Sequence, residues 1–382
     1  MRIERVELYQ ITMPLVAPFE TSGWVKTHEE RILVALYSDG VVGWGEFPGD
    51  GPWYSYETPE VSWIIIEQYL IPMLLGQPVA ATTMQYPPLE HPHDVRTRFA
   101  PVRGYPFAKH AVESAVWDLW AKQQGISLSQ ALGGTRDRVA VGVSVGIQPS
   151  LPALADRVGA YLADGYTRIK IKIKPGYDLG AVETLRAVYP DILLQVDANS
   201  AYHLDDAPIF KAMDGYNLLL IEQPLEYDDI PDHAKLQAQL ETPICLDESI
   251  HTAANARWAL EGGSCRIINI KPARLGGFTE SIAVHDICAQ HDAPVWCGGM
   301  LETGIGRAGN VALASLPNFR LPGDISASRR YYAEDIVEPE FVLNPDSTLS
   351  VPQGPGIGVE VRLDRIRARM SRMMGIANSG MA

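Results

Sequence analysis

Five charged residues stand at almost equal spacing in the middle of the chain: Lys172, Asp197, Glu222, Asp247 and Lys271. The intervals between them are 25, 25, 25 and 24 residues. Each residue ends or directly follows a short, mostly apolar run, and these runs read RIKIK, LLQVD, LLLIE, ICLD and IINIK. Ionisable groups at the ends of buried strands serve chemistry more often than packing. The spacing therefore predicts that the five side chains meet at one site.

Three neighbouring carboxylates repel one another strongly, and a divalent cation removes that repulsion. All-oxygen ligation favours Mg²⁺, with Mn²⁺ or another divalent cation as a substitute. The two lysines flank the three acids, so a substrate held between them presents one face to each lysine. A cation at a substrate carboxylate stabilises the enediolate that forms when the α-proton leaves. The predicted chemistry is abstraction of the proton α to a carboxylate by a lysine base.

Two further residues are expected at the same site. Lys170 alternates with isoleucines, so a strand places Lys170 and Lys172 on the same side. A neighbouring cation favours the neutral form of a lysine that acts as a base. Asn199 stands two residues beyond Asp197 and is expected to orient the substrate or a metal-bound water. The alternative for 168–174 is a half-exposed antiparallel strand with a solvated cationic face.

Eight apolar runs recur from residue 139 onward, and their starts are separated by 29, 25, 25, 25, 23, 28 and 25 residues. Segments long enough for helices lie between them. This alternation predicts an α/β protein, a modified TIM barrel of the type (β/α)7β, whose active site lies at the carboxyl ends of the strands. The runs are 139–147, 168–173, 193–199, 218–224, 243–249, 266–272, 294–300 and 319–324.

The first 130 residues lack this repeat. Strands are expected at 2–12 and 31–46, and helices at 59–75 and 108–124. The tail after residue 324 also lies outside the repeat, and its segment 362–374 is expected to form an amphipathic helix. We therefore expect an α+β capping domain of residues 1–130, completed by 325–382, over a catalytic barrel of residues 131–324.

The composition fits a soluble globular protein, because 46% of the 382 residues are hydrophobic and 20% are charged. The formal net charge of −14, from 32 Lys and Arg against 46 Asp and Glu, argues against a nucleic-acid or anionic-membrane partner. The four cysteines lack metal-site spacing, and no apolar run is long enough to span a bilayer. We expect a cytoplasmic protein that binds a small carboxylate substrate.

The motifs around these residues resemble those of the enolase superfamily, in its muconate-lactonising-enzyme subgroup. Within that subgroup they are similar to the o-succinylbenzoate synthase / N-acylamino acid (N-succinylamino acid) racemase family. The resemblance covers nearly the whole chain, through the motifs PFETS, AVWDLWAK, LGGTR, RIKIKIKPGYD, VDAN, IEQPL, CLDES, NIKPARLGG, GGMLETGIGRAGNVALASLPNF and GDISAS.

This resemblance implies that Asp197, Glu222 and Asp247 bind Mg²⁺ and that Lys172 and Lys271 are the acid/base pair. In the racemase reaction the two lysines exchange roles on the two faces of the α-carbon. In the synthase reaction a cyclohexadiene carboxylate loses water, a step of menaquinone biosynthesis. There one lysine acts as base and then as acid, while the other stays cationic. The resemblance also implies a homo-oligomer.

Further residues are expected to contact the substrate or to support the reacting groups. Arg274, three residues after Lys271, matches an arginine that this family associates with racemase activity. Glu248 is expected on the opposite side of its strand from Asp247, in a structural or supporting role rather than as a metal ligand. The cap loops 19–28 and 47–53 are expected to cover the acyl part of the substrate. Five more side chains are expected on the pocket wall: Phe19, Ser22, Ser144, Met300 and Glu302.

Several alternatives use the same residues. A muconate-type cycloisomerase shares the five charged positions. A dipeptide epimerase resembles this chain but carries two acids on its eighth strand, whereas Asp324-Ile325-Ser326 has one, which favours an N-acylated substrate. An aldolase with a Schiff base on Lys271 leaves three carboxylates unexplained. A metal-dependent hydrolase usually needs histidine ligands, and no strand end of this chain carries one. A non-catalytic binding barrel would not need the complete set of five.

Overall fold

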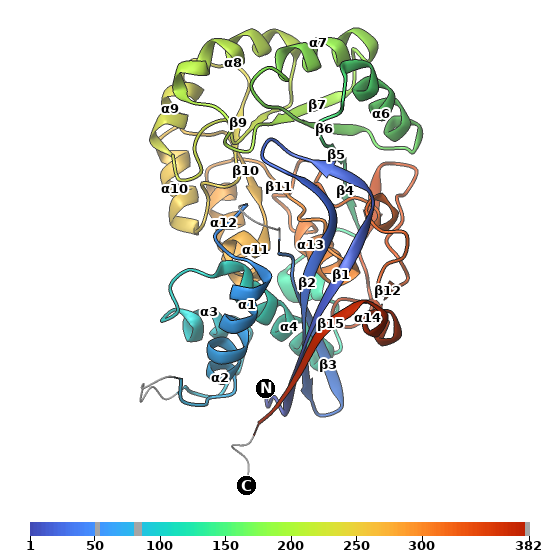
Figure 1. Ribbon diagram of the computed structural model, residues 1–382. Helices are drawn as coiled ribbons and strands as arrows, with labels where there is room; N and C mark the ends of the chain where they lie inside the picture. The colour runs from blue at the N-terminus through green and yellow to red at the C-terminus, as the bar shows by residue number, and fades with distance from the viewer. Residues whose placement is uncertain (50–53, 80–85, 379–382) are drawn as a thin grey trace.

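The computed structural model describes residues 1–49, 54–79 and 86–378, which form two main sheets with helices packed around them (Figure 1). One sheet is antiparallel. We use the name cap for this sheet together with the helices α1 to α4, which follow its third strand. The other sheet is parallel and curved, and it forms the barrel. Within these three stretches, no helix is long and apolar enough to cross a membrane.

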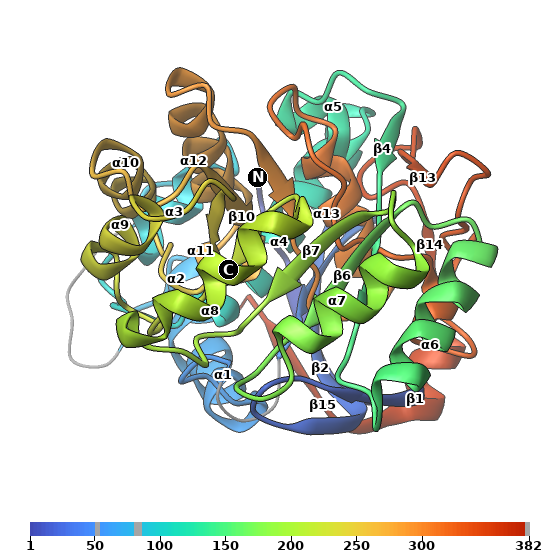
Figure 2. The same cartoon turned by 90° about the horizontal axis from the view of Figure 1, so that it is seen from above.

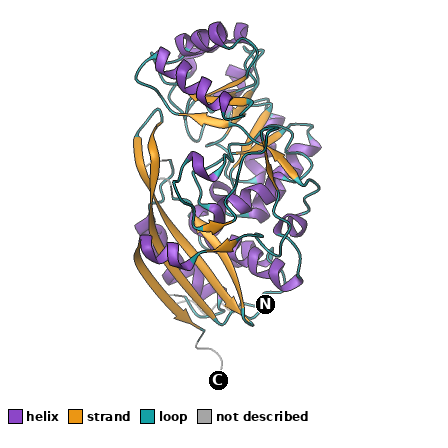
Figure 3. Ribbon diagram, turned by 90° about the vertical axis from the view of Figure 1, so that its right-hand side faces the viewer, coloured by secondary structure: helices purple, strands orange, loops and turns teal. Residues whose placement is uncertain are grey.

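The cap sheet is built from both ends of the sequence, in the order β15-β1-β2-β3 (Figure 1). Figure 3 shows the long strands of this sheet side by side. Its strands are β1 (Arg5–Glu20), β2 (Val25–Ser38), β3 (Val41–Phe47) and β15 (Met370–Ala377). Asp39 and Gly40 join β2 to β3 with positive φ angles of 49° and 76°, as a tight hairpin turn requires. Both faces of β1 are buried, because Val6 and Leu8 belong to the cap core and Tyr9 belongs to the barrel core.

Helices cover one face of the cap sheet: α1 (Pro59–Ile65), η1 (Ile66–Leu70), α2 (Ile71–Leu74), α3 (Asp94–Phe99) and α4 (Pro106–Gln124). The first three are continuous, as predicted for 59–75. The middle one is π-helical, and Pro72, which has no N–H to donate, comes two residues after it. α4 lies close to β3 because Gly43 has no side chain; a Cβ there would collide with the Ala115 carbonyl oxygen.

The barrel sheet has the order β5-β6-β7-β8-β9-β10-β11, so strands that follow one another in sequence are neighbours. Its strands are β5 (Val143–Val145), β6 (Arg168–Lys172), β7 (Leu193–Asp197), β8 (Ile221–Glu222), β9 (Ile244–Leu246), β10 (Ile267–Ile270) and β11 (Val295–Cys297). Helices alternate with them and lie on the outside (Figure 2). These helices are α6 (Leu151–Ala163), α7 (Leu179–Val188), α8 (Ala207–Met213), α9 (Pro231–Gln237), α10 (Ala253–Glu261), α12 (Phe278–Gln290) and α13 (Gly304–Ala314). The predicted fold class is confirmed.

The barrel closes through isolated bridges rather than through a regular eighth strand. Gly323 pairs with Val141 on one side, and Phe319 pairs with Val295 on the other. Pro322 lies in this segment and has no N–H for a strand ladder, which accounts for the irregular pairing. The segment 319–324 therefore occupies the predicted position of the eighth strand without forming a continuous one.

Shorter elements complete the described chain. The predicted first strand, 139–147, divides into β5 and β4 (Arg138–Ala140), and β4 pairs with β13 (Thr348–Ser350). The remaining segments are α5 (Leu128–Leu132), η2 (Leu204–Asp206), η3 (Asp214–Tyr216), α11 (Pro272–Leu275), η4 (Ser328–Arg330), β12 (Val337–Glu338), β14 (Glu360–Val361) and α14 (Leu363–Arg369). The helix expected at 362–374 is wrong beyond Arg369, because the following residues pair with β1 as β15.

Candidate active site

The five evenly spaced charged residues lie at the same end of the barrel sheet. Lys172, Asp197 and Glu222 are the last residues of β6, β7 and β8, and the register places each beside the next. Asp247 and Lys271 come directly after β9 and β10. All five side chains are buried. The ends of parallel strands thus bring together residues from five successive repeats.

Lys172 is held at one flank of the site by a carboxylate and an amide oxygen. Its Nζ donates to Asp197 Oδ2 at 2.6 Å and to Asn199 Oδ1 at 2.7 Å. Asn199 Nδ2 donates in turn to Glu248 Oε1 at 2.9 Å. Glu248 therefore faces the site, and the expectation that it lies opposite Asp247 is wrong. The reason is that β9 ends before both residues, so strand alternation no longer sets their directions.

Lys271 is held at the other flank by a carboxylate and a tyrosine hydroxyl. Its Nζ donates to Asp247 Oδ2 at 2.7 Å and to the Tyr54 hydroxyl oxygen at 3.0 Å. That hydroxyl donates to Asp247 Oδ1 at 2.9 Å, and Arg274 donates to the same oxygen. Because β7, β8 and β9 separate β6 from β10, the two lysines approach the space between them from opposite flanks.

Lys170 lies at the centre of a cluster of acids. Its Nζ is 2.5 Å from Asp324 Oδ2, 2.8 Å from Glu222 Oε2 and 3.0 Å from Asp197 Oδ2. Burial lowers the pKa of Lys170, but these carboxylates outweigh burial and raise the pKa above its usual value. Arg168 Nη1 binds the other oxygen of Asp324 at 2.7 Å. The acids thus favour the charged form of Lys170, which lies on the same side of β6 as Lys172.

The acids of the site differ in their electrostatic surroundings. Burial raises the pKa of Asp197, but Lys170 and Lys172 more than offset it and hold that pKa well below the usual range. Burial and the Asp197 charge raise the pKa of Glu222, and burial raises the pKa of Glu248. Glu248 Oε2 is buried and has no hydrogen-bond partner among the described residues. Burial thus disfavours the charged forms of Glu222 and Glu248 more than their surroundings favour them.

The chemistry of the site fits the predicted Mg²⁺ ion at Asp197, Glu222 and Asp247. The donors are all oxygen atoms, they are buried, and Glu248 adds an unpartnered carboxylate oxygen. A hard divalent cation relieves such an arrangement. In the described stretches, however, no three His, Cys, Asp or Glu side chains are arranged to hold a metal ion, and lysine ammonium groups contact the carboxylates instead. The ligand assignment stays a prediction.

A small cavity of about 40 Å³ lies between the cap and the strand ends. The barrel lines it with both flanking lysines and with Asn199, Ser144 and Met300, and the cap lines it with Phe19. All six were among the predicted site residues. The cap also contributes three residues that no motif had singled out: Trp24, Lys26 and Tyr54. All three lie within or beside the cap loops 19–28 and 47–53, which were expected to cover the substrate. That expectation was the one feature of the sequence that could have pointed to them.

Two predicted wall residues do not line this cavity. Glu302 is buried, and its Oε1 accepts from Asn310 Nδ2 of α13 at 2.8 Å. Ser22 is half-buried in the turn between β1 and β2. Within the loop 47–53, residues 50–53 lie outside the described residues. A substrate contact by Glu302, by Ser22 or by this loop stays a prediction.

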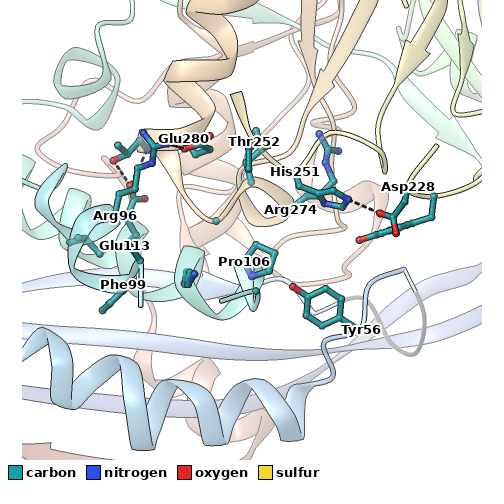
Figure 4. Close-up of a pocket in the computed structure, with 18 residues that line it drawn as sticks. Tyr56, Arg96, Phe99, Pro106, Glu113, Asp228, His251, Thr252, Arg274 and Glu280 are labelled. Atoms are coloured by element: carbon teal, nitrogen blue, oxygen red, sulfur yellow. Dashed lines mark hydrogen bonds and ion pairs between the residues drawn. The ribbon is translucent and has the colours of Figure 1, made fainter. Parts of the chain in front are cut away.

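A larger cavity of about 570 Å³ lies elsewhere between the cap and the barrel (Figure 4). Its wall includes Tyr56 from the cap and His251 and Arg274 from the barrel, and His251 Nε2 lies 3.3 Å from Asp228 Oδ1. Neither flanking lysine lines it, so it is separate from the predicted acid/base pair. Arg274 connects the two places, because it lines this cavity and binds Asp247.

Comparisons with known proteins agree with this architecture. Residues 5–133 match the mandelate racemase / muconate lactonizing enzyme N-terminal domain, and residues 153–365 match the enolase C-terminal domain-like family. An o-succinylbenzoate synthase of Geobacillus stearothermophilus is 49% identical over 363 residues, which cover 94% of each chain. An N-succinylamino acid racemase of Amycolatopsis sp is 49% identical over 361 residues, covering 94% of this chain and 95% of the relative.

A solved structure extends the similarity to three dimensions. The crystal structure of an enolase superfamily member from Listeria innocua superposes on this chain with a TM-score of 0.93. The two sequences are 39% identical, and the match covers 99% of this chain and 100% of the other. The cap and the barrel are therefore matched together, as one arrangement.

Proposed function

Since this chain belongs to the mandelate racemase / muconate lactonizing enzyme family of the enolase superfamily, we propose that it removes a proton α to a carboxylate. It acts as an N-succinylamino acid racemase, as an o-succinylbenzoate synthase or as both, the activities named for its relatives. The observation that carries this proposal is the pair of buried lysines, Lys172 and Lys271, on opposite flanks of a group of carboxylates.

The two lysines suit both reactions. In racemisation, Lys172 takes the α-proton of one enantiomer while Lys271 delivers a proton to the opposite face, and the roles reverse for the other enantiomer. In dehydration, one lysine takes the α-proton and returns it to the departing hydroxyl. The other lysine stays cationic and stabilises the negative charge that develops on the substrate.

We expect Asp197, Glu222 and Asp247 to hold Mg²⁺, which supplies electrostatic stabilisation to the substrate carboxylate as the α-proton leaves. Charge counting supports this expectation. With all groups ionised, five acids balance five cations. A neutral lysine base and the substrate carboxylate beside the α-carbon then leave two net negative charges, which one divalent cation neutralises. The groups counted are Asp197, Glu222, Asp247, Glu248 and Asp324 against Arg168, Lys170, Lys172, Lys271 and Arg274.

The surroundings of Asp324 support an N-acylated substrate over one with a free ammonium. Arg168 lies 2.7 Å and Lys170 lies 2.5 Å from its two carboxylate oxygens. An acid that is already paired with two cations gains little from a third. Ser326, at the position of the second acid in the epimerase pattern, donates to the Gly142 carbonyl oxygen at 3.2 Å instead.

We also propose that residues 1–130 and 325–382 form the capping domain and residues 131–324 the catalytic barrel. The pairing of β15 with β1, from Arg5 opposite Ala377 to Ile11 opposite Met370, supports a cap built from both ends of the chain. A homo-oligomer and a cytoplasmic location are further expectations, and the state in solution is measurable by light scattering.

A solvent-exchange screen tests the proposed function. The protein with Mg²⁺ in D₂O receives N-succinyl and N-acetyl amino acids of both configurations and, separately, the cyclohexadiene carboxylate substrate of the synthase. Proton NMR should show loss of the α-proton and inversion, or formation of o-succinylbenzoate. Lys172→Ala and Lys271→Ala should each abolish inversion while leaving Mg²⁺ binding intact. No turnover of any of these compounds by the unaltered protein would overturn the proposal.

A further inference from the structure

Tyr54 connects the cap to one of the two reacting lysines. Its hydroxyl oxygen lies 3.0 Å from Lys271 Nζ and 2.9 Å from Asp247 Oδ1, and the ammonium lies 4.4 Å from the centre of its ring. The side chain is 5% exposed, and its ring packs edge-on against Phe107 with 6.1 Å between the centroids. This tyrosine therefore touches the reacting group itself rather than the outer wall of the cavity.

The two lysines are held in matching ways. An ammonium group has three N–H donors. Lys172 donates to one carboxylate and to Asn199, and Lys271 donates to one carboxylate and to Tyr54. Among the described residues, neither lysine makes a third hydrogen bond, so one donor of each is left to face the substrate. Tyr54 thus supports Lys271 as Asn199 supports Lys172, because each accepts a hydrogen bond from the ammonium group.

The two supporting residues come from different parts of the molecule. Asn199 follows β7 and belongs to the barrel, whereas Tyr54 precedes α1 and belongs to the cap. Glu57 fixes the Tyr54 segment, because its carboxylate accepts from the backbone N–H groups of Phe107 and Ala108, each at 2.9 Å, at the start of α4. The orientation of the Lys271 side chain thus depends on the position of the cap relative to the barrel. The orientation of the Lys172 side chain does not.

We propose that Tyr54 is a positioning residue for Lys271, so that the cap orients the base on one face of the substrate only. This inference rests on the proposed function, because it uses the assignment of the two faces to the two lysines. Removing the hydroxyl should slow proton removal from the enantiomer that Lys271 deprotonates. A tyrosine that only shapes the pocket would affect both enantiomers alike.

Tyr54→Phe tests the proposal, since it removes the hydroxyl and keeps the ring. Loss of the α-proton in D₂O is followed by NMR for each enantiomer of one N-succinylamino acid, early in the reaction. Lys172→Ala and Lys271→Ala first assign each enantiomer to its lysine, because each variant should lose exchange for one of them. We expect Tyr54→Phe to slow the Lys271 enantiomer about tenfold and the other less than about twofold, as for one lost hydrogen bond to a charged group.

Two further variants provide exchange rates with which those of Tyr54→Phe are compared. Asn199→Ala is the mirror experiment and should slow the enantiomer assigned to Lys172. Tyr56→Phe is the matched control, because the Tyr56 hydroxyl accepts from Tyr105 N at 3.0 Å and its side chain lines the larger cavity, to which neither lysine contributes (Figure 4). It should leave both exchange rates unchanged.

The outcomes separate this inference from the proposed function. Equal slowing of both enantiomers by Tyr54→Phe, slowing of neither, or an increase in KM alone overturns the positioning role and leaves the proposed function standing. Absence of exchange in the unaltered protein overturns the proposed function itself. Thermal melting of each variant, at the Mg²⁺ concentration of the assay, shows that the compared proteins are equally folded.

Discussion

Asp247 shows, at the scale of single residues, how the site compensates its buried charges. Lys271 binds its Oδ2, while Tyr54 and Arg274 bind its Oδ1. Asp197 is likewise contacted by Lys170, at 3.0 Å. Removing one partner of a buried ion pair leaves an uncompensated charge, so each of these carboxylates is needed by its cation as well as by the metal ion that we expect it to bind. The effect of substituting these acids should therefore be measured on metal affinity as well as on activity.

Asp197→Asn should weaken Mg²⁺ binding by at least about tenfold, because it removes one unit of charge from an all-oxygen donor set. Calorimetric titration of Mg²⁺ into the protein measures the affinity, and Glu222→Gln and Asp247→Asn should act in the same direction. Asp346→Asn is the control, since the Asp346 side chain is 53% exposed and pairs with Arg138 at the surface. Activity that survives exhaustive chelation would disprove the metal assignment.

Local periodicity explains which site residues could be predicted from the sequence. Lys172 and Lys271 were found because strand ends recur at nearly constant spacing in a barrel of this type. Tyr54 was not, because it lies 217 positions from its partner Lys271 and no repeat relates the two. Glu248 was assigned to the wrong side because alternation holds only within a strand, and β9 has ended before it.

The difference between local and long-range information also decides which helices and strands could be predicted. The helix predicted at 108–124 is α4, Pro106–Gln124, since a helix is specified by contacts within a few residues. The helix predicted at 362–374 ends at Arg369, because β1, at the other end of the chain, offers a strand partner to residues Met370–Ala377. An edge strand depends on a neighbour that the local sequence does not reveal.

The central helix of the cap, α4, also carries a buried histidine that should make the fold sensitive to acid. His110 is 4% exposed, and its ring lies 5.5 Å from that of Phe278, across the boundary with the barrel. Burial lowers the pKa of His110 to about 3. A histidine in the unfolded chain takes up a proton near pH 6.5. Its contribution to stability is therefore complete above that pH and is lost as the pH falls from about 6.5 towards 3.

His110→Leu should flatten this dependence. Between pH 7 and pH 5 the unaltered protein should lose about 2 kcal/mol more unfolding free energy than the variant, because only its unfolded chain gains the proton. Urea unfolding at the two pH values measures the difference. His203→Gln is the control, since the His203 side chain is 76% exposed. Equal losses in His110→Leu and the unaltered protein would show that His110 is not the acid-sensitive group.

At the scale of the whole molecule, Arg31 of the cap joins the two parts beside the active site. Its side chain is fully buried, and its Nη2 donates to the carbonyl oxygens of Met300 at 2.8 Å and Leu301 at 2.9 Å. Within the cap, its Nη1 lies 3.1 Å from Glu29 Oε2 and its Nε lies 3.2 Å from Glu46 Oε1. Because Met300 and Leu301 line the small cavity of the candidate active site, one cap residue holds part of the barrel wall in place.

Arg31→Met should lower the free energy of unfolding by about 3–5 kcal/mol, because it leaves the buried Glu46 carboxylate without its cation. Adding Glu46→Gln should restore part of that loss, since the uncompensated charge is then removed. Arg329→Met is the control, because its side chain is 83% exposed and its contact with Glu340 is 3.4 Å long; urea unfolding should show no measurable change.

Arg31→Met should also raise KM in the exchange assay under conditions where it stays folded, because the Met300–Leu301 wall loses its anchor in the cap. The double variant with Glu46→Gln should recover part of the stability but not the KM, because it restores no hydrogen bond to the barrel. Recovery of both together would mean that Arg31 acts only through the charge of Glu46. An unchanged KM in folded Arg31→Met would mean that other contacts hold the cap over the site.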